Sequence, residues 1–547
     1  MRIKTALFGF ILLAASSAIA QVSTEDIDTS VIAKIKDEGL NHSQAYSIIS
    51  TLCDVYGQRL NWSPEYKNAA VWAASQLNSW GISNVHFENW APLGKGWSLK
   101  KFSLSATSPL NYPIIAYPKA WSPGLDKAIE ASTIYLDVKS ESDLENYKGK
   151  LKNKFVLISP LEEIKPHFEA DAKRDVDSVL LKMANASASV QRQRRGGSTD
   201  SNSMQKRLQE AQLNARKIEL CQNEGAIALL SSGRADDGTV TVMGASTFRM
   251  PASTSDLFGS KVNIYDADAP KVLPQIAISA EQYNRIFRVL QKGVAVKLEM
   301  NFKVEFTLAD SAFNIIAEIP GSDLKDEIVL IGGHFDSWHT GTGASDNATG
   351  TTVALEAIRI IKQLGLQPRR TIRIGLWGGE EQGLLGSRAY VKQHLAEREA
   401  SDNASGAGAN SGTLIKKSEF EKFSVYFNDD NGAGKFRGIN LQGNEAVRPI
   451  FRAWLTAIND PSAQTISPQN TGGTDHLSFD GVGVPAFQFI QDPLDYFIRS
   501  WHTNMDVLER VPEEDLRQSA TMMAIFAYNA AMRDNLIPRK PEPSKGK

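Results

Sequence analysis

The stretch DEIVLIGGHFDSWHTGTGASD, residues 326–346, decides the fold of this chain. It starts with a short apolar run, Ile328 to Ile331, whose β-branched character and terminal glycine pair are typical of a buried central strand. His334 follows directly, Asp336 comes two residues later, and a loop of small residues leads on to Asp346. In open α/β sheets the carboxyl ends of the strands are where ligands bind. The stretch therefore predicts a strand of an α/β fold that delivers an imidazole and carboxylates to a site.

A second strand ends in the same way. Residues 371–376 form another apolar run, which leads through Trp377 and two glycines to the adjacent residues Glu380 and Glu381. Between the two strands, residues 351–364 carry apolar side chains at helical spacing and predict a helix. Two strand ends thus place one imidazole and several carboxylates within reach of one another, and such groups are candidate metal ligands.

Length and composition limit the class of protein. At 547 residues the chain is too long for one ordinary domain, and two domains are expected. A net charge of −2 gives no electrostatic argument for a nucleic-acid partner or an anionic membrane surface. The basic run 191–195 lacks interleaved aromatic residues, which favours a charged helix end. Cys53 and Cys221 allow either one disulfide or two separate buried thiols.

The first 20 residues have the form of a secretory signal. Arg2 and Lys4 precede an apolar run, Ala6 to Ala15, and Ala18-Ile19-Ala20 forms a small-residue cleavage site. The apolar run is well short of the roughly 20 residues that span a bilayer. We therefore expect an exported protein without a membrane span, secreted or periplasmic, whose mature chain begins at Gln21.

The pattern of elements changes twice along the chain. A turn-rich junction follows residue 120, and a strand-rich module extends to about residue 300, with one of its strands expected at 239–243. Strand–helix alternation resumes after that module. The predicted organisation is a signal at 1–20, a first catalytic segment at 21–119, an inserted domain with a helical insertion at 120–300, a second catalytic segment at 301–537, and a disordered tail at 538–547.

A hydrolytic metal site needs nitrogen and carboxylate ligands, an open coordination position and a base for the water. Taken singly, a glutamate pair after a strand is usually a solvated helix start, and a lone histidine is more often structural than a ligand. The joint pattern favours a site, because most of the candidates follow a strand or a glycine turn. In chain order the candidates are His334, Asp346, Glu380, Glu381, Asp430 and His502. Asp429 and His476 compete with Asp430 and His502.

These motifs resemble those of the co-catalytic dizinc exopeptidases, a family that includes zinc aminopeptidases and carboxypeptidase Q-like enzymes. The resemblance covers nearly the whole mature chain. It implies a three-layer α/β sandwich with a mixed central sheet, and it implies that the module at 120–300 is an inserted, β-rich protease-associated domain. The matching stretches are GHFDS at 333–337, ASDNATG at 344–350, WGGEEQGLLGS at 377–387, FNDDNG at 427–432, GTDH at 473–476 and His502-Thr503.

The resemblance also implies a role for each residue. Asp346 would bridge two zinc ions, His334 and Asp430 would complete one site, and Glu381 and His502 the other. Glu380 would be the general base for the attacking water. Asp336 would orient the imidazole of His334 by contacting the ring nitrogen that does not bind the metal. Asp475 and His476 would lie near the active site, and a cis peptide is implied between Asp346 and Asn347.

Other functions are built on the same catalytic fold. A glutaminyl cyclase-like enzyme would hold a single zinc, and a non-catalytic receptor would lack ligands. The complete ligand set favours a metalloexopeptidase that acts on short peptides. The sequence does not distinguish trimming of amino termini from trimming of carboxyl termini, and a homodimer is compatible with it.

Overall fold

A computed structural model describes residues 25–91, 93–187, 201–258, 262–308, 312–399 and 413–540. The predicted signal, the Gln21 start, the basic run 191–195 and residues 541–547 of the predicted tail lie outside these ranges. No helix in the described ranges is both long enough and apolar enough to cross a membrane.

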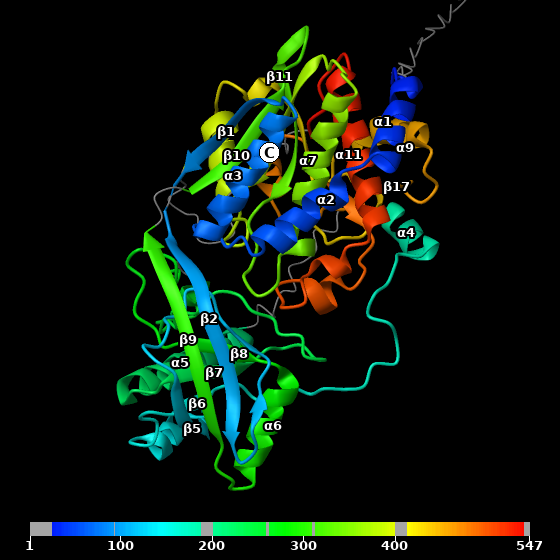
Figure 1. Cartoon of the computed structure of the whole chain (residues 1–547). Coiled ribbons are helices and arrows are strands. Elements are labelled where there is room, and N and C mark those ends of the chain that lie inside the picture. Colours follow the sequence, from blue (N-terminus) through cyan, green and yellow to red (C-terminus); the bar gives the residue numbers. More distant parts are fainter. Residues whose placement is uncertain are drawn as a thin grey trace, which may run out of the picture.

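Two eight-stranded sheets organise the chain, one in the upper and one in the lower half of Figure 1. The first sheet is mixed, and its three central strands, β11, β15 and β18, run parallel. In order across the sheet its strands are β1 (Ser83–Trp90), β10 (Ala312–Ile319), β12 (Arg370–Trp377), β11 (Leu324–His334), β15 (Phe423–Asn428), β18 (Ala486–Gln491), β16 (Phe436–Asn440) and β17 (Thr465–Ser467).

The central strands form where apolar runs and glycines coincide. β11 and β12 pair in parallel, with Gly332 opposite Gly375. A Cβ atom at Gly332 would lie 2.0 Å from the carbonyl oxygen of Gly375, so the close approach of the two strands requires glycine. The predicted strands at 328–331 and 371–376 are both confirmed; the first is longer by four residues before and three after, the second by one residue at each end.

Helices cover both faces of the first sheet. On one face the helices share a core with Val329, Ile374 and Phe427. On the other face α8 (Leu385–Tyr390) and α10 (His476–Asp480) pack with Trp377 and Tyr426. The predicted three-layer α/β arrangement with a mixed central sheet is confirmed. The helices of the first face are α1 (Thr29–Asn41), α2 (Ala45–Ser50), α3 (Pro64–Ser79), α7 (Thr349–Gln363), α9 (Arg448–Ile458) and α11 (Glu513–Met532).

The second sheet is built around two long antiparallel strands that run down the lower half of Figure 1. Its strands, in order, are β3 (Tyr112–Pro113), β2 (Lys95–Ser108), β9 (Lys297–Leu308), β5 (Ile129–Tyr135), β6 (Phe155–Leu157), β7 (Ala228–Ser232), β8 (Gln275–Ile278) and β4 (Ala116–Pro118). This differs from the predicted segments, because β2, β3 and β4 precede residue 120. The difference arises because β2 pairs along its length with β9, some 200 residues later in the chain.

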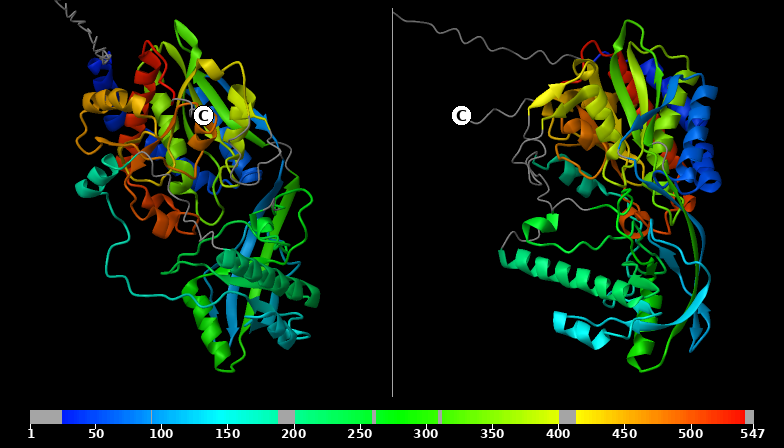
Figure 2. Two further views of the ribbon diagram at one scale, coloured as in Figure 1. Left: turned by 180° about the vertical axis from the view of Figure 1, so that it is seen from behind. Right: turned by 90° about the vertical axis from the view of Figure 1, so that its left-hand side faces the viewer.

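Helices also accompany the second sheet. α5 (Ser201–Glu224) and α6 (Ala280–Gln291) pack near it, and the short strands β13 (Ala396–Arg398) and β14 (Leu414–Lys416) pair with each other elsewhere. α4 (Asp177–Ala184) leaves the second sheet and packs beside β17 of the first sheet, as both views in Figure 2 show. Cys53 and Cys221 are separate buried thiols, which decides between the two alternatives.

The segment 239–243 departs from the expectation of a strand in the second sheet. Thr241 instead forms an isolated antiparallel bridge with Thr503. The N–H of Asn504 donates to the carbonyl oxygen of Val240 at 3.3 Å, and the side-chain oxygen of Asn504 accepts from the N–H of Val240 at 2.6 Å. Val240 and Val242 thus pair with the chain around His502, while the N–H of Thr241 donates to Gly233, so the prediction of a sheet strand there is wrong.

Candidate metal centre

The carboxyl ends of β11 and β15 bring together the first group of ligand-type side chains. His334 is the last residue of β11, Asp430 follows β15 by two residues, and Asp346 lies in the short turn η4 (Ala344–Ala348) before α7. His334 Nε2 lies 3.3 Å from Asp346 Oδ1 and 3.5 Å from Asp430 Oδ1. The three side chains are buried and their ligand atoms could hold one metal ion.

A second group shares Asp346 with the first. His502 Nε2 lies 3.0 Å from Glu381 Oε2 and 3.4 Å from Asp346 Oδ2. Each oxygen of the Asp346 carboxylate therefore faces a different histidine. Asp346, Glu381 and His502 are also close enough to hold one metal ion. The arrangement is that of two neighbouring cation sites with one bridging carboxylate.

Buried polar atoms without hydrogen-bond partners test whether metals fit here. Among the described residues, His334 Nε2, Asp346 Oδ2 and Glu381 Oε1 are buried and accept or donate no hydrogen bond. Each buried polar atom without a partner costs free energy unless water or a ligand completes it. All three belong to the two groups, and imidazole nitrogen with carboxylate oxygen is a donor set that zinc prefers. The residues present therefore fit a pair of zinc ions.

The charges of the site also require cations. Burial raises the pKa of Glu380 well above its usual value, and burial likewise raises the pKa of Glu381. Burial alone would lower the pKa of His502, but the Glu381 and Asp346 carboxylates raise it to about 9. Carboxylates this close to one another repel unless a positive charge lies between them.

Asp336 fixes the position of Glu380 and Glu381 relative to His334. Its carboxylate accepts from the N–H of Glu380 at 3.1 Å and from the N–H of Glu381 at 3.3 Å. Its main-chain oxygen lies 2.9 Å from His334 Nδ1. Because a carbonyl oxygen only accepts, Nδ1 carries the proton, which turns Nε2 toward the two carboxylates. One residue thus connects the ends of β11 and β12.

Asp506 supports Asp346, and sequence reasoning missed it. Its carboxylate accepts from the N–H of Ser345 at 2.6 Å, from the Ser345 hydroxyl at 2.7 Å and from the N–H of Asp346 at 3.2 Å. The one local signal was its place four residues after His502. The peptide between Asp346 and Asn347 is cis, as the family resemblance implied.

Arg59 is a second supporting residue whose role the sequence did not reveal. Its fully buried guanidinium donates to the main-chain oxygens of Phe335, Thr342 and Gly343, at 2.8 to 2.9 Å. These carbonyls belong to the loop that connects His334 to Asp346. Arg59 therefore fixes the loop between two candidate ligands through multiple charge-assisted hydrogen bonds.

The structure separates the competing residues. The carboxylate of Asp429 belongs to neither group, and its main-chain oxygen accepts from Asn347 Nδ2 at 2.8 Å. His476 also lies outside both groups, with Nε2 lying 3.0 Å from Thr471 Oγ1, and burial lowers its pKa to about 4. Asp475 is buried beside it, before α10. Asp430 and His502 are therefore the residues that the fold brings together.

An open cavity of about 500 Å³ leads to these groups. Its lining includes five of the candidate residues, Asp346, Glu380, Glu381, Asp430 and His502. Its other lining residues are Gly383, Leu384, Arg388, Asn431, Gly472, Gly473, Thr474, Leu477, Tyr496, Phe497 and Trp501. The ring of Trp501 stacks on that of His502 with centroids 3.9 Å apart. The cavity is large enough for a short peptide end.

Known proteins share both the sequence and the fold. Residues 314–527 match the model of peptidase family M28. Carboxypeptidase Q from Mus musculus is 30% identical over 278 residues, which is 50% of this chain and 53% of the relative. The chain thus spans about half the length of that relative.

Two solved structures have a similar fold. The peptidase M28 precursor from Shewanella amazonensis has a TM-score of 0.61 at 24% identity, covering 95% of this chain and all of the other. A zinc aminopeptidase from Bacillus subtilis has a TM-score of 0.52 at 20% identity, covering 90% of this chain and 95% of the other. The candidate ligands described above, and Glu380 beside them, all lie within residues 314–527, the segment that matches the model of peptidase family M28.

Proposed function

We propose that this chain is an exported, zinc-dependent exopeptidase that hydrolyses the peptide bonds of short peptides. The observation that carries the proposal is the pair of ligand groups that share Asp346, each with one histidine and one further carboxylate. A glutaminyl cyclase-like enzyme would need only one of the two groups. A receptor on this fold would need neither. The complete pair favours two-metal hydrolysis.

Each group would hold one zinc ion. His334 and Asp430 would complete one site, Glu381 and His502 the other, and Asp346 would bridge them. When bound, two zinc ions polarise the scissile carbonyl, lower the pKa of water and stabilise the developing oxyanion. The zinc aminopeptidase from Bacillus subtilis, which is similar in fold to this chain, supports this choice of metal.

Glu380 is proposed as the general base. It lines the cavity beside Asp346 and Asp430, and it precedes the proposed ligand Glu381. Asp336 holds its main chain in place, so its carboxylate can take a proton from the attacking water and return it to the leaving nitrogen.

Metal content and two matched variants test the proposal. Zinc per chain should be about two, chelation should abolish peptide hydrolysis, and added zinc should restore it. Glu380→Gln should keep both metals and lower kcat by about a hundredfold or more, because it removes only proton transfer. Glu381→Gln should instead lose metal affinity. A fully active protein without bound metal would overturn the proposal.

Export and substrate choice need separate tests. The mature protein should begin at Gln21, as mass spectrometry of the exported protein would show. A library of short peptides blocked at either end would distinguish aminopeptidase from carboxypeptidase action. We further propose that the second sheet belongs to a protease-associated domain, on the family resemblance of the whole chain.

A further inference from the structure

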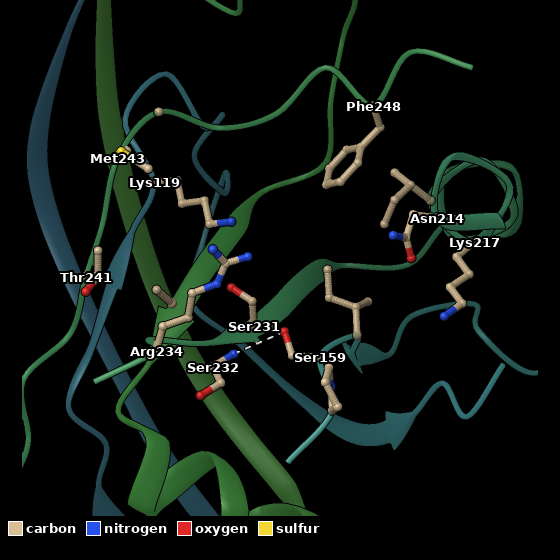
Figure 3. A pocket seen from close by; sticks show the side chains of 15 residues that line it. Lys119, Ser159, Asn214, Lys217, Ser231, Ser232, Arg234, Thr241, Met243 and Phe248 are labelled. Atoms are coloured by element: carbon tan, nitrogen blue, oxygen red, sulfur yellow. Dashed lines mark hydrogen bonds between the residues drawn. The ribbon is translucent and has the colours of Figure 1, made fainter. Parts of the chain in front are cut away.

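A separate cavity of about 360 Å³ lies beside the second sheet, between the carboxyl ends of β6 and β7, helix α5 and the chain that follows β7. None of its lining residues lines the cavity of the candidate metal centre. Figure 3 shows that side chains from three different parts of the chain point into it.

Two cationic side chains lie next to each other in the lining of this cavity. The ammonium group of Lys119 and the guanidinium group of Arg234 lie together in Figure 3. Burial lowers the pKa of Lys119, and the neighbouring charge of Arg234 lowers it further. A third cation, Lys217, lines the cavity from α5, and Figure 3 shows its ammonium group apart from the other two. Like charges held together in this way favour an anion between them.

No acidic residue lines the cavity. Within the described part of the chain, neither Lys119 nor Arg234 forms an ion pair, and neither does Lys217. Asp137 and Asp143 act on Lys217 only as more distant charges. The cavity therefore holds positive charge that the protein itself does not neutralise.

Hydroxyl groups border the same space. Ser159, Ser231 and Ser232 come from the ends of β6 and β7. Ser232 is only 6% exposed, and its Oγ has no hydrogen-bond partner among the described residues. Its N–H donates to Ser159 Oγ at 3.3 Å, the dashed line of Figure 3. A buried hydroxyl without a partner is costly unless a ligand or water completes it.

Apolar side chains complete the lining. Phe248, from the chain after β7, lies across the cavity from Lys119 in Figure 3, and Ile218 of α5 also lines the cavity. An inorganic anion would leave these side chains in contact with water. An organic anion would cover them while its charged end contacts the cations, and such a mixture of apolar lining and a few placed polar groups is typical of small-molecule sites.

We propose that this cavity binds a small organic carboxylate, with its charged end between Lys119 and Arg234 and its apolar part against Phe248 and Ile218. The hydroxyl of Ser159, just after β6, donates to the same carboxylate. The cavity is separate from that of the metal centre, and the proposal does not rest on the proposed peptidase function. It assigns a ligand-binding role to the second sheet.

Calorimetric titration of the zinc-loaded full chain with 3-phenylpropionate tests the site. We expect one binding event, at least about tenfold weaker for the neutral 3-phenylpropionamide and for inorganic phosphate, because each lacks either the charge or the apolar part. Lys119→Met and Arg234→Gln should each weaken binding by about tenfold or more. Lys152→Met, an exposed lysine of the same sheet region outside the cavity, should leave it unchanged.

Two further outcomes would overturn the proposal. Binding that is lost in His334→Ala and kept in Lys119→Met would place the carboxylate at the metal centre instead. Phosphate that binds as tightly as 3-phenylpropionate would show a general anion site without selection for an organic ligand. Circular dichroism of each variant separates lost binding from lost folding. Arg234 is exposed, so Arg234→Gln is expected to fold normally.

Discussion

The main-chain N–H of Val242 donates a hydrogen bond of 2.9 Å to the carbonyl oxygen of His502. Val242 belongs to the segment that follows β7 of the second sheet, and His502 is a candidate ligand at the first sheet. His502 itself has a φ of 59°, in the left-handed region that few non-glycine residues occupy. The backbone conformation of this ligand is therefore held by a segment more than 250 residues earlier in the chain.

Arg499 strengthens the same connection. It lies in the turn η8 (Tyr496–Ser500), and its guanidinium donates to Asp171 Oδ2 at 2.7 Å and to Asp237 Oδ2 at 2.7 Å. It also donates to Thr239 Oγ1 at 3.1 Å. These three partners all lie before residue 240, far from Arg499 in the sequence. Arg499 thus fixes the turn that leads into His502.

Replacing Arg499 by methionine should weaken zinc binding at the His502 site by about tenfold, because supporting residues that orient a ligand have effects of that size. The measurement is zinc per chain as free zinc is varied. The matched control is Arg174→Met, since Arg174 pairs with Asp492 and Asp515 and so also connects the inserted segment to the first sheet, away from His502. Equal losses in the two variants would contradict a specific role for Arg499.

His502→Ala and His476→Ala should differ in metal content. His502→Ala leaves only Glu381 and the shared Asp346 from the protein at its site, so about one zinc ion per chain should be lost and added zinc should restore activity only in part. His476 contacts Thr471 and belongs to neither group, so His476→Ala should keep both metals and change only the kinetic constants. The opposite pattern of zinc content would exchange the two assignments.

The adjacent residues Asp429 and Asp430 provide a second matched pair. Asp430→Asn should weaken zinc binding strongly, because an amide is a poorer ligand than a carboxylate in the group with His334 and Asp346. Asp429→Asn should keep both zinc ions, and its thermal stability should change by less than about 1 kcal/mol, because the new side chain has the same shape. Zinc loss in Asp429→Asn alone would show that the other carboxylate is the ligand.

His394 should make stability depend on pH above neutrality. Burial alone would lower its pKa, but hydrogen bonds with Glu419 and Glu88 raise it to about 9. A raised folded-state pKa stabilises the fold fully below the unfolded value of about 6.5, and this stabilisation is lost as pH rises through about 9. The loss should be on the order of 2–3 kcal/mol.

Denaturant unfolding at pH 6 and pH 10 measures this contribution. His394→Gln should remove most of the difference in unfolding free energy between the two conditions. His86→Gln is the control. His86 lies in β1, and its ring forms a hydrogen bond with the main-chain oxygen of Asn84. This variant should keep the difference in unfolding free energy between pH 6 and pH 10. An unchanged pH dependence in His394→Gln would show that other groups cause it.

Much of the first sheet was predictable because its signals are local. Buried parallel strands read as apolar runs, and the helix after residue 349 shows its period in its own side chains. The glycines that end β11 and β12 mark where the chain must turn toward a site. The candidate residues His334, Asp346, Glu380 and Glu381 could be named for the same reason, since each directly follows such a signal.

The other features depend on contacts between distant parts of the chain, which no local pattern records. Asp506 and Arg59 support the loop around Asp346 from 160 residues after it and more than 270 before it. Segment 239–243 has the composition of a sheet strand, but its backbone groups pair with the chain at 502–504. The sequence alone determined the strand ends and their chemistry, through burial and backbone geometry that act over a few residues. Only the tertiary structure decided that Asp430 and His502 complete the groups, because that choice depends on which side chains long-range packing turns toward Asp346.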